Sequence, residues 1–216
     1  MTKREPCERL LQPGVIPIIR AESAQGLVEA GEALAKAGIA AVEVTLTTPN
    51  ALQVISEMAQ RFTRDAIVGA GTVLDVGMAR AALAAGAQFV VTPVMKPDII
   101  RFCQAQEKPI VSGAFTPTEA YGAYEAGADF IKIFPAGLLG PGYIQNMRAP
   151  LPMLRIIPTG GVTPENAGDF IRAGCVAIGA GASLLPDAAI KARDWSSVSE
   201  RVAAYTGAVA AARATA

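Results

Sequence analysis

The chain has 216 residues, 51% of them hydrophobic, and its 19 basic residues balance 19 acidic ones. This length fits one domain or at most two small ones, and the even charge balance argues against nucleic-acid or membrane-surface partners and against disorder. There is no histidine, which excludes a Ser–His–Asp relay and any histidine-dependent zinc site. Acid–base chemistry must therefore use carboxylates, lysine, tyrosine or water.

Short β-branched runs alternate with alanine-rich, helix-prone segments along the whole chain. The predicted strands are 15–20, 41–46, 66–72, 89–93, 109–113, 130–135, 155–161 and 176–181. The predicted helices are 24–37, 50–61, 76–85, 97–106, 117–126, 142–149, 164–173 and 195–212. Most of these helices end on a glycine, as in KAGIA and EAGAD, and several begin with a Thr-Pro pair, as in TPTEA and TPENA.

Eight strand–helix units with apolar strands indicate an α/β fold in which helices cover a parallel sheet. Eight such units can close into a barrel, whereas a doubly wound open sheet is the alternative. The segment RAESAQG after the first strand lacks a dinucleotide fingerprint, which favours the barrel. We therefore expect a (β/α)8 TIM barrel with an extra N-terminal helix, spanning residues 1–216 as a single domain.

The cysteines and the N-terminus give no sign of secretion. Cys7, Cys103 and Cys175 are odd in number and widely spaced, unlike a disulfide framework or a zinc knuckle. The charged start MTKREPCERL lacks the apolar part of a signal peptide, and no apolar stretch approaches the ~20 residues of a membrane helix. We expect a soluble cytoplasmic protein with cysteines reduced and buried.

Two ionisable residues interrupt strands that should be apolar. Lys132 lies in DFIKIFPA and Glu43 in AVEVTL. Desolvation favours the neutral amine, which can form an imine with a ketone, and a neighbouring carboxylate could then shuttle protons. The alternatives are a lysine that extends out between helices and a structural ion pair without a catalytic role.

The ends of barrel strands carry further candidates. Arg20 ends the first strand, where it could bind a carboxylate or phosphate or lie on the surface. Thr72 ends the third strand and Thr92–Pro93 the fourth, and either threonine could instead cap a helix. PTGG (158–161) and GAGAS (179–183) follow the last two strands, where barrels often bind phosphate, although tight turns also need glycine.

Together these segments resemble the class I aldolases that act on 2-keto-3-deoxy-6-phosphogluconate (KDPG) and 4-hydroxy-2-oxoglutarate (KHG). The resemblance runs from about residue 10 to 205. Its carriers are VEVTLTTP, VGAGTVL, FVVTP, GAFTPTEA, FIKIFPA, GPGYI, IIPTGGVTPEN and AIGAGASLL.

The resemblance implies a cytoplasmic homotrimeric lyase that needs no metal or cofactor and acts on a small keto-acid phosphate. It also implies a role for each matching position. Lys132 would form the Schiff base and Glu43 would be the general acid and base. The implied substrate-binding residues are Arg20, Thr72, Pro93, Phe134, Gly160, Gly161, Gly181 and Ser183.

Two positions depart from the family pattern. Thr47 stands where many members have an arginine, so that carboxylate binding would fall on Arg20 and Thr72. Ala182 stands where many have a serine, with Ser183 one residue later. GPGYI also resembles the relatives that act on 2-keto-3-deoxy-6-phosphogalactonate. A phosphosugar isomerase or epimerase and a non-catalytic sugar-phosphate-binding barrel are the other functional alternatives.

Overall fold

The computed structural model describes residues 3–62 and 66–215. Eight parallel strands form one sheet in the order β7-β6-β5-β4-β3-β2-β1-β8. The strands are β1 Val15–Ile19, β2 Ala41–Thr45, β3 Ile67–Gly71, β4 Val90–Val91, β5 Ile110–Ala114, β6 Phe130–Ile133, β7 Ile156–Pro158 and β8 Ile178–Ala180. A parallel bridge between Thr159 and Gly179 joins the two ends of the sheet, which makes it a barrel. The expected (β/α)8 TIM barrel is confirmed.

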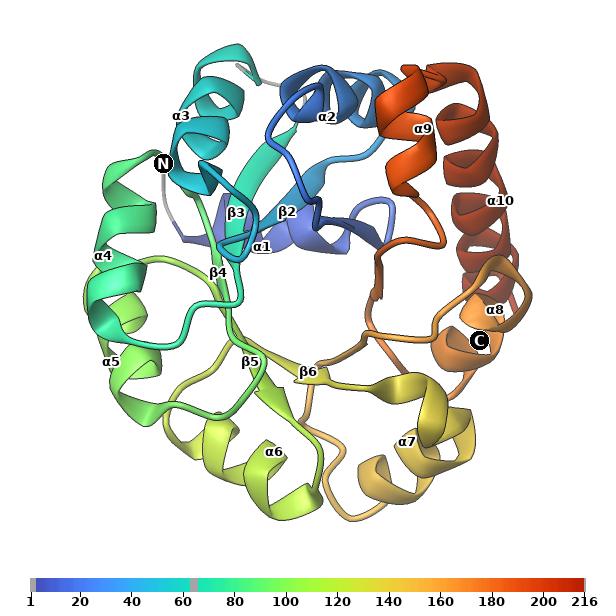
Figure 1. The fold of residues 1–216 in the computed structure, drawn as a ribbon. Helices are drawn as coiled ribbons and strands as arrows, with labels where there is room; N and C mark the ends of the chain where they lie inside the picture. The colour runs from blue at the N-terminus through green and yellow to red at the C-terminus, as the bar shows by residue number, and fades with distance from the viewer. Residues whose placement is uncertain (1–2, 63–65, 216) are drawn as a thin grey trace.

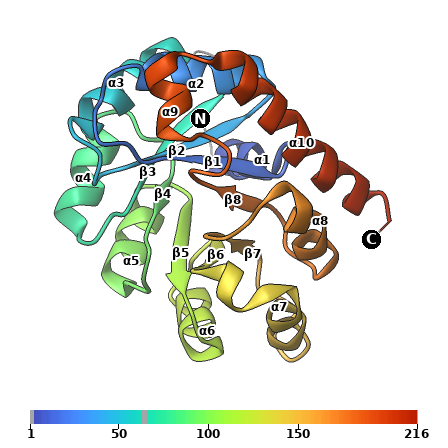
Figure 2. The same ribbon diagram turned by 45° about the vertical axis from the view of Figure 1, so that its right-hand side comes forward.

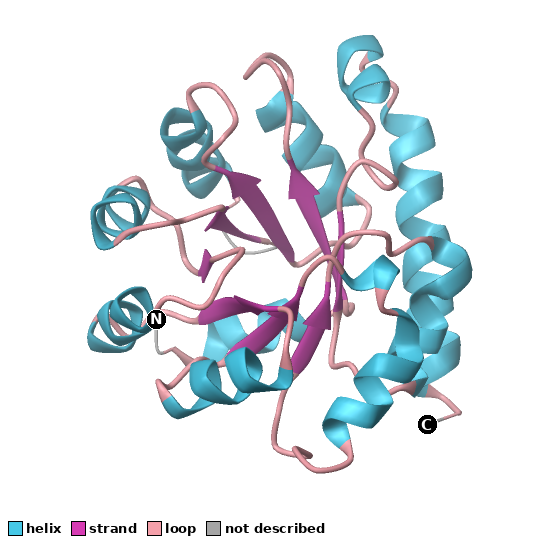
Figure 3. Ribbon diagram, turned by 60° about the horizontal axis from the view of Figure 1, so that its bottom comes forward, coloured by secondary structure: helices cyan, strands magenta, loops and turns pink. Residues whose placement is uncertain are grey.

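Helices surround the strands as a ring (Figure 1; cyan in Figure 3). They are α1 Arg4–Leu11, α2 Leu27–Lys36, α3 Ala51–Arg61, α4 Val76–Ala84, α5 Pro97–Ala105, α6 Pro117–Glu125, α7 Gly140–Arg148, α8 Pro164–Arg172, α9 Asp187–Ala192 and α10 Trp195–Arg213, with a 3₁₀ turn at Ala136–Leu138. The expected N-terminal helix is α1, and α9 is an addition that the sequence analysis did not predict. None of the helices in the described ranges combines the length and apolar character needed to cross a bilayer.

The two faces of each strand pack into different apolar clusters, as the two-residue period of a strand requires. Val42 and Val44 of β2 and Ile131 and Ile133 of β6 pack outwards against the helices. The inner cluster fills the barrel and comprises Leu10, Ile16, Ala41, Ile67, Phe89, Val91, Val111, Phe130, Ile157 and Ala177. Because Leu10 belongs to α1, this helix closes the end of the barrel at which the strands begin.

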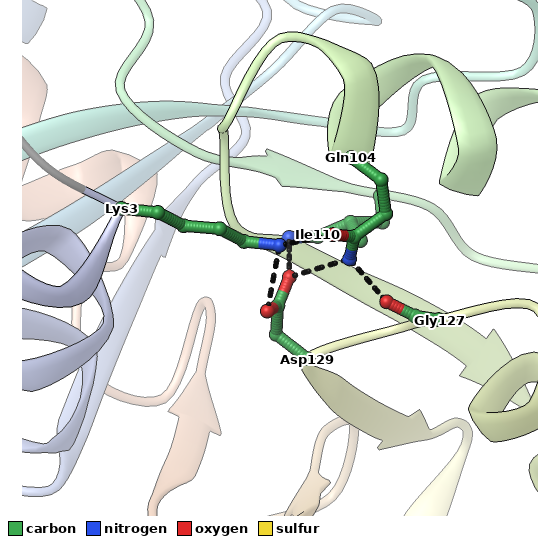
Figure 4. A network of polar contacts seen from close by, with 5 residues as sticks. All are labelled: Lys3, Gln104, Ile110, Gly127 and Asp129. Atoms are coloured by element: carbon green, nitrogen blue, oxygen red, sulfur yellow. Dashed lines mark hydrogen bonds and ion pairs between the residues drawn. The ribbon is translucent and has the colours of Figure 1, made fainter.

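A polar network attaches the start of α1 to the sheet (Figure 4). Lys3 Nζ lies 2.9 Å from Asp129 Oδ1 and 2.6 Å from Gln104 Oε1. Asp129 Oδ2 also accepts a hydrogen bond of 2.9 Å from the backbone N–H of Ile110, and the Gln104 amide donates to the Gly127 carbonyl. Asp129, in the loop before β6, thus connects Lys3 at the start of α1 with the first residue of β5.

Asp129→Ala should therefore destabilise the protein by about 1–3 kcal/mol, because it leaves the partly buried Ile110 N–H without its acceptor and the Lys3 ammonium without its carboxylate. Urea unfolding followed by circular dichroism measures the change. Glu8→Ala is the control, because Glu8 pairs with Arg4 where both side chains are exposed, and it should change the midpoint little. Equal effects of the two variants would contradict the role of the network.

Candidate active site

The sequence places two ionisable side chains inside the barrel by strand periodicity. Glu43 follows Ala41 by two residues in β2, and Lys132 follows Phe130 by two residues in β6. Ala41 and Phe130 both belong to the inner cluster, so Glu43 and Lys132 also point inwards, one layer nearer the carboxyl ends of the strands. Both are nearly inaccessible, with side-chain exposures of 3% for Glu43 and 8% for Lys132.

The two groups face one another within ion-pair distance but without a direct hydrogen bond. Lys132 Nζ lies 3.8 Å from Glu43 Oε1, which is an ion-pair distance but longer than a hydrogen bond. Glu43 Oε1 has no hydrogen-bond partner within the described part of the chain. A buried carboxylate oxygen without a hydrogen bond raises the free energy of the folded protein. The same oxygen is free to accept a proton from a bound molecule, which is what a general base does.

Glycine at position 71 creates the space for this carboxylate. Gly71 ends β3, and a Cβ atom there would lie 1.9 Å from Glu43 Oε1 and 2.5 Å from its Cδ. The next residue, Thr72, has a φ of 57°, in the left-handed region that threonine rarely adopts. Such backbone conformations concentrate at functional sites, because the surrounding structure must enforce them.

A cavity of about 470 Å³ opens above Lys132 at the carboxyl ends of the strands. Its lining residues are Ile18, Arg20, Thr72, Pro93, Lys132, Phe134, Thr159, Gly160, Gly181 and Ala182. The Lys132 ammonium nitrogen also lies 5.4 Å from the centre of the Phe134 ring. The carboxyl ends of the strands are where barrel enzymes carry their active sites, so this cavity is the candidate active site.

Most of the residues expected from the sequence line this cavity. Besides Lys132, these are Arg20, Thr72, Pro93, Phe134, Gly160 and Gly181. Arg20 is exposed and has no ion-pair or hydrogen-bond partner among residues 3–62 and 66–215, so its guanidinium is available to a ligand. Thr47, at the position of the missing arginine, does not line the cavity, and its hydroxyl lies 3.1 Å from that of Thr45.

Two of the expected substrate-binding residues, Ser183 and Gly161, are not among the residues that line the cavity. The Ser183 hydroxyl lies 3.2 Å from the Val162 carbonyl and 2.7 Å from the Tyr205 hydroxyl, whereas Ala182 faces the cavity. Gly161 packs against Gly137, and its carbonyl accepts a hydrogen bond of 3.0 Å from Asn166. Ser183 and Gly161 could still reach a ligand through their backbone N–H groups.

The loops after β7 and β8 carry unpaired backbone donors. Within the described ranges, no hydrogen bond is recorded for the backbone N–H groups of Gly161, Ala182 and Ser183. Gly160 and Gly161 have φ values of 80° and 81°, which glycine alone adopts without strain. Unpaired N–H groups on two adjoining glycine-rich loops are suited to binding an anion.

The sequence analysis missed two lining residues, Ile18 and Thr159. Thr159 immediately precedes Gly160 in the PTGG segment and could have been found as the polar residue that directly follows β7. Ile18 is apolar within an apolar strand and carried no signal. In the residues that the structure describes, histidine, cysteine, aspartate and glutamate side chains nowhere form a group of three that could hold a metal ion.

Gly71→Ala should lower the free energy of unfolding by about 1–3 kcal/mol, because the added methyl group occupies the space of the Glu43 carboxylate. Urea denaturation gives this value. Gly207→Ala is the matched control, since nothing lies within 4 Å of a Cβ there and alanine favours the α10 helix. A Gly71→Ala protein as stable as the Gly207→Ala protein would contradict the packing argument.

Comparison with known proteins agrees with this geometry. A 2-dehydro-3-deoxy-phosphogluconate aldolase of Treponema pallidum is 36% identical over 192 residues, which cover 88% of this chain and 91% of the relative. A 2-dehydro-3-deoxy-6-phosphogalactonate aldolase of Escherichia coli is 39% identical over 153 residues, covering 70% and 75%.

Among solved structures, the KDPG aldolase of Legionella pneumophila superposes with a TM-score of 0.83 at 29% identity, covering 93% of this chain and 97% of that one. That structure was captured with pyruvate as a covalent carbinolamine intermediate. The family model described as KDPG and KHG aldolase matches residues 7–201. The chain therefore belongs to the KDPG and KHG aldolase family and is an aldolase, a lyase of carbon–carbon bonds.

Proposed function

We propose that the chain is a class I aldolase that cleaves KDPG to pyruvate and D-glyceraldehyde 3-phosphate through a Schiff base on Lys132. The observation that carries the proposal is the buried Lys132 nitrogen at the base of the cavity, 3.8 Å from a Glu43 oxygen that lacks a hydrogen bond. In this proposal 4-hydroxy-2-oxoglutarate is a second substrate, cleaved to pyruvate and glyoxylate. Homotrimeric assembly and a cytoplasmic location are part of the same proposal and rest on the family resemblance.

The reaction begins with attack of the neutral Lys132 amine on the C2 ketone. Glu43 moves the protons that convert the carbinolamine, with loss of water, into an iminium ion. Glu43, directly or through a water molecule, then takes the proton of the C4 hydroxyl. The C3–C4 bond breaks, its electrons pass into the iminium to form an enamine, and the aldehyde leaves. Protonation of the enamine at C3 and hydrolysis release pyruvate and restore the amine.

The cavity lining supports the following placement of the substrate. Arg20 and Thr72 bind the carboxylate next to the reacting ketone, while Pro93 and Phe134 shape the space around the pyruvate portion. The unpaired N–H groups after β7 and β8 bind the distal phosphate. Gly160, Gly161, Gly181 and Ser183 contribute backbone rather than side-chain contacts in this arrangement.

The 6-phosphogalactonate analogue is the second candidate substrate, because the Escherichia coli relative named for it is 39% identical. The two sugars differ in configuration at C4, the carbon whose hydroxyl loses its proton. Their relative kcat/KM values for this protein distinguish the two candidates.

Borohydride trapping tests the Schiff base. Pyruvate and borohydride should add one reduced pyruvate to the protein at Lys132, and Lys132→Met should abolish the adduct, because methionine has no amine. Intact-mass and peptide mass spectrometry measure this. Lys36→Met, which removes an exposed lysine from α2, should trap like the wild type. An unmodified wild-type chain, or an adduct on another lysine, would overturn the proposal.

Glu43→Gln should lower kcat by about 10²–10⁴-fold, because an amide cannot shuttle protons, while pyruvate trapping at Lys132 persists at a reduced rate. Steady-state cleavage assays and timed borohydride quenches give the two numbers. Glu57→Gln on α3 is the control and should behave as the wild type. A Glu43→Gln enzyme with near-normal kcat would show that Glu43 forms only a structural ion pair.

A further inference from the structure

Tyr205 connects a helix on the outside of the barrel to both glycine-rich loops. It lies on α10, which runs beside α8 (Figures 1 and 2), and its side chain is fully buried. Its hydroxyl lies 2.9 Å from the carbonyl of Val162, in the loop after β7, and 2.7 Å from the hydroxyl of Ser183, in the loop after β8. Burial raises the pKa of Tyr205, so the hydroxyl keeps its proton and can donate it.

The same region carries further contacts between the two loops and α10. The Ser183 hydroxyl lies 3.2 Å from the Val162 carbonyl, which links the loops directly. Arg201, one helical turn before Tyr205, donates a hydrogen bond of 3.2 Å to the Ser183 carbonyl. The backbone N–H groups of Leu184 and Leu185 return to the Gly181 carbonyl and close the turn after β8. Tyr205, Ser183 and Arg201 form what we call the α10 clasp.

The clasp lies on the side of the loops that faces away from the cavity. Tyr205 and Arg201 do not line the cavity, whereas Gly160, Gly181 and Ala182 do. The unpaired N–H groups come from two separate loops, so they converge on one anion only if the loops keep a fixed spacing. Contacts that hold the N–H donors in place before the anion binds raise the affinity, because the loops then lose less conformational entropy on binding.

We propose that Tyr205 is a positioning residue for phosphate recognition, whose hydroxyl holds the loops after β7 and β8 at the spacing that a phosphate group requires. This inference rests on the proposed function, in which those loops bind the distal phosphate. It also explains why Ser183 faces outwards in a chain that has Ala182 at the cavity. The Ser183 hydroxyl stabilises the loop from the side opposite the cavity instead of contacting the ligand.

Tyr205→Phe removes the hydroxyl and keeps the ring. It should raise KM about three- to tenfold for KDPG, the loss expected for one neutral hydrogen bond. KM and kcat for 4-hydroxy-2-oxoglutarate, which has no phosphate, should stay unchanged. The affinity for inorganic phosphate, measured by titration calorimetry, should fall by the same factor as that for KDPG. Borohydride trapping of pyruvate should remain at the wild-type level.

Ser183→Ala and the double variant complete a mutant cycle. Ser183→Ala should also raise KM for KDPG, and the effects of the two changes should not add, because the two hydroxyls share one hydrogen bond and both lie at the Val162 carbonyl. Thr206→Val is the matched control. Among the described residues the Thr206 hydroxyl bonds only to the α10 backbone, at 2.9 Å from the Val202 carbonyl, so its loss should affect neither substrate.

Two results would overturn the inference. One is a Tyr205→Phe enzyme whose KM rises equally for KDPG and 4-hydroxy-2-oxoglutarate, which indicates general destabilisation. The other is a variant with unchanged KM for KDPG and unchanged phosphate affinity. Failure of the proposed function looks different, since the wild-type protein itself would then trap no pyruvate and show no preference for the phosphorylated substrate.

Discussion

The inward-facing pair of Lys132 and Glu43 is the constraint that the rest of the active site accommodates. Two ionisable groups in an apolar barrel are unfavourable unless each compensates for the other, and their 3.8 Å separation provides only part of that compensation. The space that Glu43 needs exists because β3 ends in Gly71. Because Gly71 of β3 has no side chain, the Glu43 carboxylate of the neighbouring strand β2 has room inside the barrel. The pair of Glu43 and Lys132 therefore depends on three strands, β2, β3 and β6.

The architecture was predictable from the sequence because two signals agreed. The β-branched runs repeat eight times and four of the helices between them end on a glycine, and only a closed parallel sheet gives all eight strands equivalent surroundings. The positions predicted for the strand ends were less accurate than the number and order of the strands. The segment 89–93 was expected as a strand, but β4 retains only Val90 and Val91; Pro93, which has no N–H to donate to a ladder, lines the cavity instead. Helix α9 was missed because six residues are too short for a periodic pattern.

Site residues were predictable where an ionisable or polar residue lies in an apolar strand or at the end of one. A lysine and a glutamate inside apolar strands stand out in a one-dimensional sequence, and Arg20 or Thr72 stand out at strand ends. Tyr205 does not, because a buried tyrosine on a helix reads as an ordinary core residue. The direction of the Ser183 side chain was equally invisible, since one residue of difference in a turn decides between the cavity and the outer surface. Such outcomes depend on contacts between segments far apart in the chain.

The apolar cluster beneath Lys132, closed off by α1, has a consequence for the order of events in catalysis. A cavity sealed at its base admits and releases molecules through the mouth alone. In the proposed mechanism the pyruvate fragment is bound covalently to Lys132, at the base of the cavity, so the aldehyde departs before pyruvate. In the direction of synthesis the sequence reverses, and pyruvate must enter first. The packing of Leu10 and Phe130 at the far end of the barrel therefore leaves the mouth as the route for both products.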